Sequence, residues 1–553
     1  MITHDRVDVC VVGLGAAGGT IAAQAAAAGL RVAGVEAGAD HGANAGEGFD
    51  TDEITYVVDQ ALQWRDPEVL VFNGRPPVVS NWLSRNIGVG GPHHWSGFAI
   101  RFHPSDFRVA STSGVPAGSS VADWPISYDE LAPFYDEAEA MLSVSAGTPH
   151  PWQPPRERGF PQPPLPDTRR GQLLTEAGRR LGWHPFRPPA AILTERVASS
   201  PRAPCNFCGH CTLFGCTRNS KASTAVTVLP AARASGCLEV RPRCLAVQIT
   251  VDRSGRPSAV RYLDHLGQAH EQPATVIVLA NNAPYAAKLL LLSRSPKHPA
   301  GLGNQHDQVG RHVTFHTSTC VYGLFDEPLH AARGPAPQVA IDDFSEDRPL
   351  RSGADFSRGG QMVGGMPASF AGGALSFVLA LDEWLPLPEG VPAYGDGLLR
   401  FAESAFSRHM AVFCLGEDVP CAENRVTLDP EVRDRAGLPA LRVEYAHHPE
   451  DVRQIEYLAG RARTWLEEAG ARRVVRARTA LPGGMRAGHA HGTTRMGLDP
   501  ETSVTDDFGQ VHGVDNLFVA GAGGFVTSAG VNPCLTVVAL ARRAAPRIID
   551  RAR

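Results

Sequence analysis

The chain lacks several features that would assign it to whole classes of protein. No stretch of about 18 apolar residues occurs among its 553 residues, so no membrane-spanning helix is expected. The net charge is -5, so neither a broad basic surface nor a nucleic-acid partner is expected. The first expected strand begins near Val7, which leaves no room for a signal peptide.

Cysteine is also too scarce to hold the chain together. Eleven cysteines in a chain this long do not make a disulfide scaffold, so we expect a reducing, cytoplasmic compartment. Hydrophobic residues at 43% and charged residues at 20% are typical of a globular enzyme. Because a single core rarely serves more than about 300 residues, we expect two domains.

A glycine-rich turn near the N-terminus predicts a dinucleotide site. Residues 7–12 form a short apolar run typical of a buried parallel strand, and residues 20–28 are small and apolar enough for a packed helix. Between them, Gly13 permits a tight turn, Gly15 lets the backbone approach a pyrophosphate, and Gly18 lets the helix lie close to the strand. The free amides at the start of this helix would bind the phosphates.

An acidic residue at the end of the next strand completes this site. The second strand, residues 31–35, ends in Glu36, which lies 23 residues after Gly13. A carboxylate at this distance accepts hydrogen bonds from both hydroxyls of an adenosine ribose. The motif does not by itself distinguish FAD from NAD.

Three more segments carry a family resemblance. From Gly88 the chain reads Gly-Val-Gly-Gly-Pro-His-His-Trp-Ser-Gly. Near the C-terminus it reads His-Ala-His-Gly-Thr-Thr-Arg-Met-Gly from His489 and Gly-Val-Asn-Pro-Cys-Leu-Thr from Gly530. Together with the N-terminal glycines, these motifs resemble the glucose-methanol-choline (GMC) oxidoreductase family over essentially the whole chain. Within that family the chain is most similar to the bacterial sugar and sugar-acid dehydrogenases.

The resemblance implies an α/β fold with two interleaved domains. A Rossmann-like FAD-binding domain would take residues 1–110, 200–316 and 476–553. An α+β substrate-binding domain built on an antiparallel sheet would take residues 317–475. Residues 111–199, which contain a proline-rich segment, would form a cap.

The resemblance also implies which residues contact the flavin. The expected contacts are Gly90, Gly91, His94, Gly521, Ala522 and Asn532. Some relatives attach FAD covalently through a histidine, which makes His93 and His94 candidates. The alternative is that one ring packs on the flavin and the other bonds to backbone, and noncovalent FAD is the favoured interpretation.

The chain departs from the family pattern at three places. Gly521-Ala522-Gly523 stands where an aspartate-containing turn is usual, and Asn281-Asn282 stands where a glycine is more common. The loop at Gly90 and Gly91 is shorter than usual by about one residue.

The C-terminal motifs are the candidate reacting centre. Removing an alcohol proton as hydride leaves needs a base within hydrogen-bond reach, and histidine titrates near neutrality. The family pattern His-x-x-Gly-Thr selects His489, with His491 as the alternative. The resemblance implies that Asn532, 43 residues after His489, shares the substrate oxygen. Pro533 would begin the last helix, whose N-terminus would favour negative charge on the reduced flavin.

Four cysteines lie close together in the middle of the chain. They are Cys205, Cys208, Cys211 and Cys216. Their spacing is similar to a ferredoxin ligand run, so they are candidate ligands of an iron–sulfur cluster. Zinc held by four thiolates is a second interpretation, and a structural loop without metal is a third.

The combined hypothesis is an FAD-dependent dehydrogenase that oxidises an alcohol group of a sugar, polyol or amino sugar. An oxidase that uses oxygen is the first alternative. A lyase with structural FAD, or a non-catalytic electron-transfer subunit, is the alternative from another class. The sequence leaves the substrate and the electron acceptor open, and a cluster would imply a redox partner protein.

Overall fold

The computed structural model describes the chain outside a few segments. The description leaves out residues 43–62, 65, 81–82, 84, 87, 92, 94, 148–149, 210, 213, 331–332, 347, 352, 367–380, 382–384 and 479–487, and gives only the backbone of 63–64 and 85–86. Among the predicted site residues, His94 lies outside the described residues.

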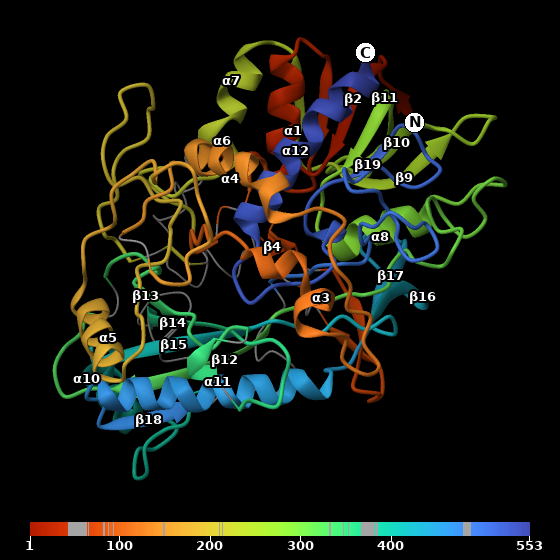
Figure 1. The fold of residues 1–553 in the computed structure, drawn as a ribbon. Helices are drawn as coiled ribbons and strands as arrows, with labels where there is room; N and C mark the ends of the chain where they lie inside the picture. Colours follow the sequence, from red (N-terminus) through yellow and green to blue (C-terminus); the bar gives the residue numbers. More distant parts are fainter. Residues whose placement is uncertain are drawn as a thin grey trace.

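A largely parallel sheet forms one part of the molecule (Figure 1). Its strands run in the order β8 (Leu238–Arg241), β3 (Val32–Val35), β2 (Val7–Val12) and β11 (Ala269–Leu279), and β19 (Leu517–Val519) also pairs with β11. All these pairs are parallel, as the predicted Rossmann-like domain requires. An antiparallel extension adds β9 (Leu245–Val251) and β10 (Pro257–Leu263), while β1 (Ile2–Thr3) pairs parallel with β11.

Helices cover both faces of this sheet. Val9 and Val11 of β2 pack with helices α1 (Ala16–Ala27) and α12 (Cys534–Ala552). The alternate residues of β2 pack with α8 (Ala283–Leu292) on the opposite face. Because side chains alternate across a strand, a strand buried on both faces is apolar throughout, which explains the continuous apolar run in the sequence.

A second, antiparallel sheet forms the other main layer (Figure 1). Its strands run in the order β13 (Val339–Ile341), β14 (Gly360–Met366), β15 (His409–Gly416), β12 (Thr317–Leu324) and β18 (Arg473–Arg476). All its pairs are antiparallel, which confirms the predicted fold class.

The two faces of the antiparallel sheet have different neighbours. Helices α11 (Pro449–Glu468) and α5 (Arg169–Arg180) cover the outer face, where Trp465 packs against the strands. The inner face packs against Phe98 and Val531, which belong to the segments expected to contact the flavin. The reacting centre is therefore expected between this face and the parallel sheet.

A third sheet crosses the expected domain boundary. Its strands run in the order β16 (Arg425–Arg433), β17 (Pro439–Tyr445), β5 (Glu68–Phe72) and β6 (Val78–Ser80). Strands β5 and β17 are parallel neighbours, although the sequence assigns them to different domains.

The segment 111–199 divides between the two layers. Helix α4 (Tyr128–Leu142), capped by Ser127 and Glu130, packs on α12, whereas α5 packs under the antiparallel sheet. The remaining elements are β4 (Gln63–Trp64), β7 (Arg85–Asn86), α3 (Val109–Ser113), α6 (Thr224–Thr227), α7 (Leu229–Ala234), α10 (Asp396–Phe406), and 3-10 turns η2 (Pro104–Phe107), η3 (Pro349–Arg351) and η4 (Ala522–Gly524).

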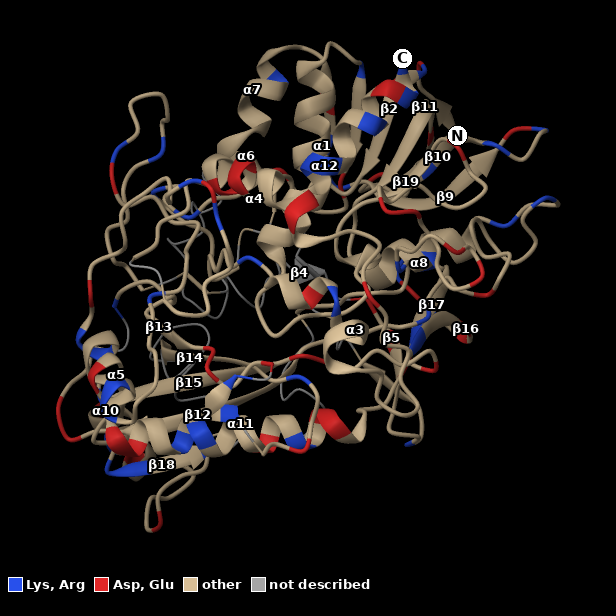
Figure 2. Cartoon of the chain, in the orientation of Figure 1, with Lys and Arg blue, Asp and Glu red and all other residues tan. Residues whose placement is uncertain are grey.

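Charges of both signs are scattered over the view in Figure 2 rather than gathered in one region. In this view the described residues show no broad basic face. Within the described ranges, no helix combines the length and the apolar character that crossing a bilayer requires.

Candidate active site

The N-terminal glycines form a cradle with open space at its middle position. Gly13 has a φ of +87°, and a Cβ there would lie 2.9 Å from the Cα of Asn281. A Cβ on Gly18 would overlap the carbonyl oxygen of Gly13, so the helix lies directly on the turn. A Cβ on Gly15 would meet nothing nearer than the carbonyl oxygen of Gly91 at 4.0 Å. The backbone at Gly15 is therefore free to face a pyrophosphate.

Glu36 connects the segments around this cradle. Its buried carboxylate accepts hydrogen bonds from the backbone amides of Leu14 at 2.9 Å, Gly38 at 2.9 Å and Gly88 at 3.1 Å. The carboxylate thus lies at the end of β3, beside the glycine-rich turn. Binding of a ribose by Glu36 stays a prediction.

The loop at Gly90 lies against the same turn. The Gly90 amide donates to the carbonyl of Leu14 at 2.9 Å, and a Cβ on Gly90 would overlap Ala225. His93 is buried, and its Nε2 lies 3.0 Å from the carbonyl of Val89. This is the backbone contact that the interpretation without covalent attachment expects of one of the two rings, and the mode of FAD attachment stays a prediction.

Several buried polar atoms at this junction have no hydrogen-bond partner among the described residues. They are Asn281 Oδ1, Asn282 Oδ1, Thr494 Oγ1, both ring nitrogens of His491, and both amide atoms of Gln361. A buried polar atom without a partner costs about 1–3 kcal/mol. Asn281 borders Gly13, and Thr494 Oγ1 would lie 2.5 Å from a Cβ on Gly523. The residues present therefore fit a polar dinucleotide cofactor, which would supply the missing partners.

Backbone hydrogen bonds join the two C-terminal motifs. The amides of Gly492, Thr494 and Met496 donate to the carbonyls of Ala522, Gly523 and Gly524 at 3.1, 3.1 and 2.9 Å. The predicted flavin turn at Gly521 and Ala522 thus runs alongside the segment that begins at His489. Gly521 has a φ of +113°, which favours glycine at that position.

Three histidines meet beside the start of β12, at one end of the antiparallel sheet. The Nδ1 atoms of His489 and His316 lie 2.8 Å apart, and Nε2 of His316 lies 3.1 Å from the carbonyl oxygen of Ser528. The His491 ring stacks on Phe525, with ring centroids 5.2 Å apart. His316 and His491 are buried, whereas His489 is only half-buried. His489 is therefore the most accessible ring of this cluster.

Burial keeps these rings neutral. It lowers the pKa of His489 to about 4 and, together with the neighbouring His489, that of His316 to about 3. Burial also lowers the pKa of His491 well below its usual value. At neutral pH each ring therefore carries one proton and one lone pair.

The carbonyl of Ser528 sets the direction of the hydrogen bonds. A carbonyl only accepts, so His316 donates from Nε2 and keeps a lone pair on Nδ1. His489 must then donate from its own Nδ1 to His316. This leaves the lone pair of His489 on Nε2, where it can accept a proton.

His316 is a residue of this centre that the sequence motifs do not predict. Its position follows Val309-Gly310-Arg311, a stretch that resembles the family's return to the cofactor domain, by only five residues. Nothing in its immediate neighbours distinguishes it from the other histidines. Its role becomes visible only when β12 is placed beside the C-terminal motif.

Asn532 is half-buried at the start of the last helix. The helix begins at Cys534, one residue later than predicted, and Pro533 is its N-cap. The carbonyl that holds His316 belongs to Ser528, four residues before Asn532. The structure thus joins the two predicted catalytic segments through His316.

A buried lysine organises the cysteine-rich loop. The ammonium group of Lys221 donates to the carbonyls of Trp95 and Phe214 at 2.7 Å each and to that of Cys211. Burial lowers the pKa of Lys221 to about 8. The Trp95 indole donates to the Ala222 carbonyl at 2.9 Å. The loop is therefore fixed against the segment that follows Gly90 and Gly91.

The four cysteines of this loop are not gathered as a bound zinc ion would hold them, and zinc binding stays a prediction. Within the described ranges no three of their sulfur atoms lie within 4.8 Å of one another, as tetrahedral zinc requires. Burial raises the pKa of Cys205 to about 11 and that of Cys211 to about 12, whereas Cys208 is exposed. Cys216 is half-buried. The iron–sulfur cluster stays a prediction, because nothing in the geometry tests it.

A two-domain fold with a glycine-rich nucleotide cradle and a histidine centre is typical of a dinucleotide-dependent oxidoreductase. Residues 123–318 and 420–541 match the two family models described as GMC oxidoreductase. The chain is 32% identical to 6'''-hydroxyparomomycin C oxidase of Streptomyces lividus over 98% of this chain and 91% of that one. It is 28% identical to the gluconate 2-dehydrogenase flavoprotein of Pantoea cypripedii over 97% of this chain and 92% of that one.

A further relative and a solved structure agree with these matches. The chain is 30% identical to 2-methyl-1,2-propanediol dehydrogenase of Mycolicibacterium austroafricanum over 99% of this chain and 96% of that one. The fold is similar to pyridoxine 4-oxidase from Mesorbium loti, with a TM-score of 0.66, 18% identity and 98% of each chain covered. The chain therefore belongs to the GMC oxidoreductase family, and it is an enzyme that acts on alcohol groups.

Proposed function

We propose that the protein is an FAD-dependent dehydrogenase that oxidises an alcohol group of a sugar, polyol or amino sugar, with His489 as the base. The observation that carries this proposal is the chain of hydrogen bonds from His489 through His316 to the carbonyl of Ser528. These two hydrogen bonds leave a lone pair on Nε2 of the half-buried His489 ring, as general-base catalysis requires.

The residues that would hold FAD are those of the cradle. The amides at the start of α1 would bind the pyrophosphate above Gly15, and Glu36 would accept the ribose hydroxyls. Gly90, Gly91, Gly521 and Ala522 would border the flavin. When bound, FAD supplies the acceptor for the hydride that leaves the alcohol carbon. Attachment is proposed to be noncovalent, which the backbone bond of His93 supports.

The proton transfer uses groups that are already in place. His489 would accept the alcohol proton at Nε2 while its Nδ1–H stays bonded to His316. The imidazolium would thus be steadied by a neutral neighbour that is itself fixed by Ser528. The amide of Asn532 would donate to the substrate oxygen, and the N-terminus of α12 would favour negative charge there.

The substrate class and the electron acceptor follow from different observations. The names of the relatives cover gluconate, a diol and an aminoglycoside, which supports a polyhydroxylated alcohol. Dehydrogenase activity is preferred because a cluster on the cysteine loop would pass electrons to a protein or quinone. Oxidase activity is the second candidate, favoured by the names of two relatives. The eleven cysteines are all free thiols, which supports a cytoplasmic location.

Anaerobic reduction of the bound flavin tests the proposal. Protein reconstituted with FAD should lose its flavin absorbance when a sugar or polyol substrate is added without oxygen. Flavin that stays oxidised with every alcohol offered, in protein that nevertheless holds FAD, would favour the lyase or the electron-transfer subunit. Subsequent dye reduction or oxygen uptake then separates dehydrogenase from oxidase.

A further inference from the structure

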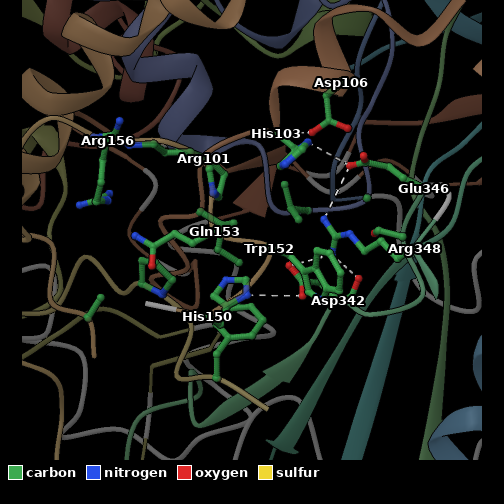
Figure 3. A pocket seen from close by; sticks show the side chains of 18 of the residues that line it. Arg101, His103, Asp106, His150, Trp152, Gln153, Arg156, Asp342, Glu346 and Arg348 are labelled. Atoms are coloured by element: carbon green, nitrogen blue, oxygen red, sulfur yellow. Dashed lines mark hydrogen bonds and ion pairs between the residues drawn. The ribbon is translucent and has the colours of Figure 1, made fainter. Parts of the chain in front are cut away.

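A polar pocket lies beside the segment that leads to Asn532 (Figure 3). Gly530 and Val531 form one part of its wall, and Trp152 and Asp342 form another. Its cavity volume is about 50 Å³. One water molecule needs roughly 10–15 Å³ on this scale, so the pocket has room for several hydroxyl groups.

The charges that line this pocket balance one another. Its five carboxylates belong to Asp106, Glu139, Asp342, Glu346 and Glu417, and its five guanidinium groups belong to Arg101, Arg156, Arg187, Arg348 and Arg358. Most are bound to each other: Arg358, for example, pairs with Glu417 at 2.8 Å, and Arg348 pairs with Asp342 at 3.1 Å. A pocket without excess negative charge does not concentrate a polycation.

Three buried polar atoms of the pocket have no hydrogen-bond partner among the described residues. They are Nδ1 of His150, Oδ1 of Asp342 and Nε of Arg156. Nδ1 of His150 and Oδ1 of Asp342 face each other at 3.7 Å, too far for a hydrogen bond between them (Figure 3). The His150 ring is held by stacking on Phe186, with centroids 3.7 Å apart. Burial lowers the pKa of His150, so the ring is neutral at pH 7.

The three atoms require partners of mixed character. Asp342 Oδ1 needs a donor, Arg156 Nε–H needs an acceptor, and neutral His150 Nδ1 takes either according to its tautomer. A hydroxyl group is both donor and acceptor, so hydroxyls satisfy all three atoms. An ammonium group would satisfy Asp342 but has nothing to offer Arg156.

We propose that this pocket binds a neutral, hydroxyl-bearing part of the substrate, away from the carbon that is oxidised beside Asn532. The inference rests on the proposed function, since it assigns the pocket to the substrate of the His489 centre. It narrows the substrate class to neutral sugars and polyols with several hydroxyl groups. A substrate that places an ammonium group in this pocket would bind less well.

Calorimetric titration of the FAD-loaded enzyme tests this inference. The probes are maltose, D-glucose and myo-inositol as neutral ligands, and paromamine as a cationic one. In Asp342→Asn the side-chain oxygen stays with Arg348 and an amide donor replaces the free acceptor. His150→Phe keeps the stacking on Phe186 and removes Nδ1. Because hydrogen bonds to charged groups are strong, Asp342→Asn should weaken binding of a neutral probe about tenfold or more.

A matched control variant and the reduction of the flavin distinguish failure of this inference from failure of the proposed function. Asp326→Asn changes an aspartate that is 83% exposed and pairs with Arg472 outside the pocket, so it should bind like the wild type. Thermal melting of each variant checks that it is folded. The inference fails if no neutral probe binds, if Asp342→Asn and His150→Phe bind as Asp326→Asn does, or if paromamine binds more tightly than every neutral probe. A probe that binds through the pocket without reducing the flavin instead counts against the proposed function.

Discussion

The Nδ1 atoms of His316 and His489 lie 2.8 Å apart, and the bond between them has one possible direction. His316 donates to the Ser528 carbonyl, so it can only accept from His489. The tautomer of the proposed base is therefore decided by a residue that the substrate need not touch. His316 is a positioning residue in this interpretation.

His316→Phe should lower kcat while leaving FAD bound. The phenyl ring fills the space but no longer accepts from Nδ1 of His489, so both tautomers of the base become populated. Misorientation of this kind costs on the order of 100-fold. His409→Phe is the control, because His409 is also buried and bonded to a carbonyl, that of Ala405, but lies outside the centre. Equal kcat values in the two variants would remove His316 from the mechanism.

His489→Ala should abolish most turnover without releasing FAD. Positioned acid–base catalysis contributes roughly 100- to 10,000-fold, so kcat should fall within that range. Steady-state rates with a dye acceptor and the flavin absorbance of the purified variant give the two readouts. A loss smaller than about tenfold would transfer the role of base to His491.

The acid limb of the activity profile should lie well below the usual pKa of histidine. The base works only when neutral, and burial lowers the pKa of His489 to about 4. Activity measured as kcat/KM should therefore stay level from pH 7 to about pH 5 and fall as the pH approaches 4. An apparent pKa near 6.5 would show that the base is a more exposed group.

Stability should fall over the same acid range. The unfolded chain protonates its histidines below about pH 6.5, whereas the folded chain holds His489, His316 and His93 neutral until about pH 4, 3 and 4. Folded pKa values that are depressed give stability that is present above pH 6.5 and lost as the pH falls. Melting temperatures recorded between pH 7 and pH 4.5 should therefore decrease steadily. A constant melting temperature would contradict the buried, neutral cluster.

Asp418→Asn should stabilise the protein, and more so at pH 8 than at pH 5. Asp418 is fully buried, and burial together with the charge of Asp451 raises its pKa well above the usual value. When folding raises the pKa of a carboxyl group, the folded protein becomes less stable as the pH rises toward that pKa. An amide does not ionise, so the variant has no such loss. Asparagine also keeps an oxygen for the amide of Phe315 and the hydroxyl of Tyr445. Calorimetry at both pH values gives the comparison, and a variant less stable than the wild type at pH 8 would contradict the raised pKa of Asp418.

Metal analysis of anaerobically purified protein decides the role of the cysteine loop. If Cys205, Cys208, Cys211 and Cys216 bind a cluster, iron and sulfide should be present and visible absorbance should extend beyond the flavin bands. Protein without iron would leave Lys221 as the organiser of a purely structural loop. Iron would predict a protein or quinone acceptor and slow reaction with oxygen.

The parallel sheet was predictable because each of its signals is local. The apolar run at 7–12, the glycines after it and the acid at the end of the next strand each depend on a few neighbouring residues. The sequence also predicts a helix over residues 450–468, and α11 spans Pro449–Glu468. Local patterns thus located the nucleotide cradle and the last motifs.

Contacts between distant segments were not predictable. The sequence predicts a helix over residues 398–410, but α10 ends at Phe406 and β15 begins at His409, because that strand completes the sheet between β14 and β12. His316 was not predicted either. Its partner His489 lies 173 residues away in the sequence, and no local pattern indicates a contact between such distant residues.

The pairing of β5 with β17 has a consequence for how the chain is made. Strand β5 ends at Phe72, and its parallel neighbour β17 ends at Tyr445. During synthesis the N-terminal strand must therefore wait, with one edge unpaired, until more than two thirds of the chain has left the ribosome. A cut at the boundary between the expected domains would leave this sheet divided between the two pieces. The expected nucleotide and substrate regions are therefore not separate folding units.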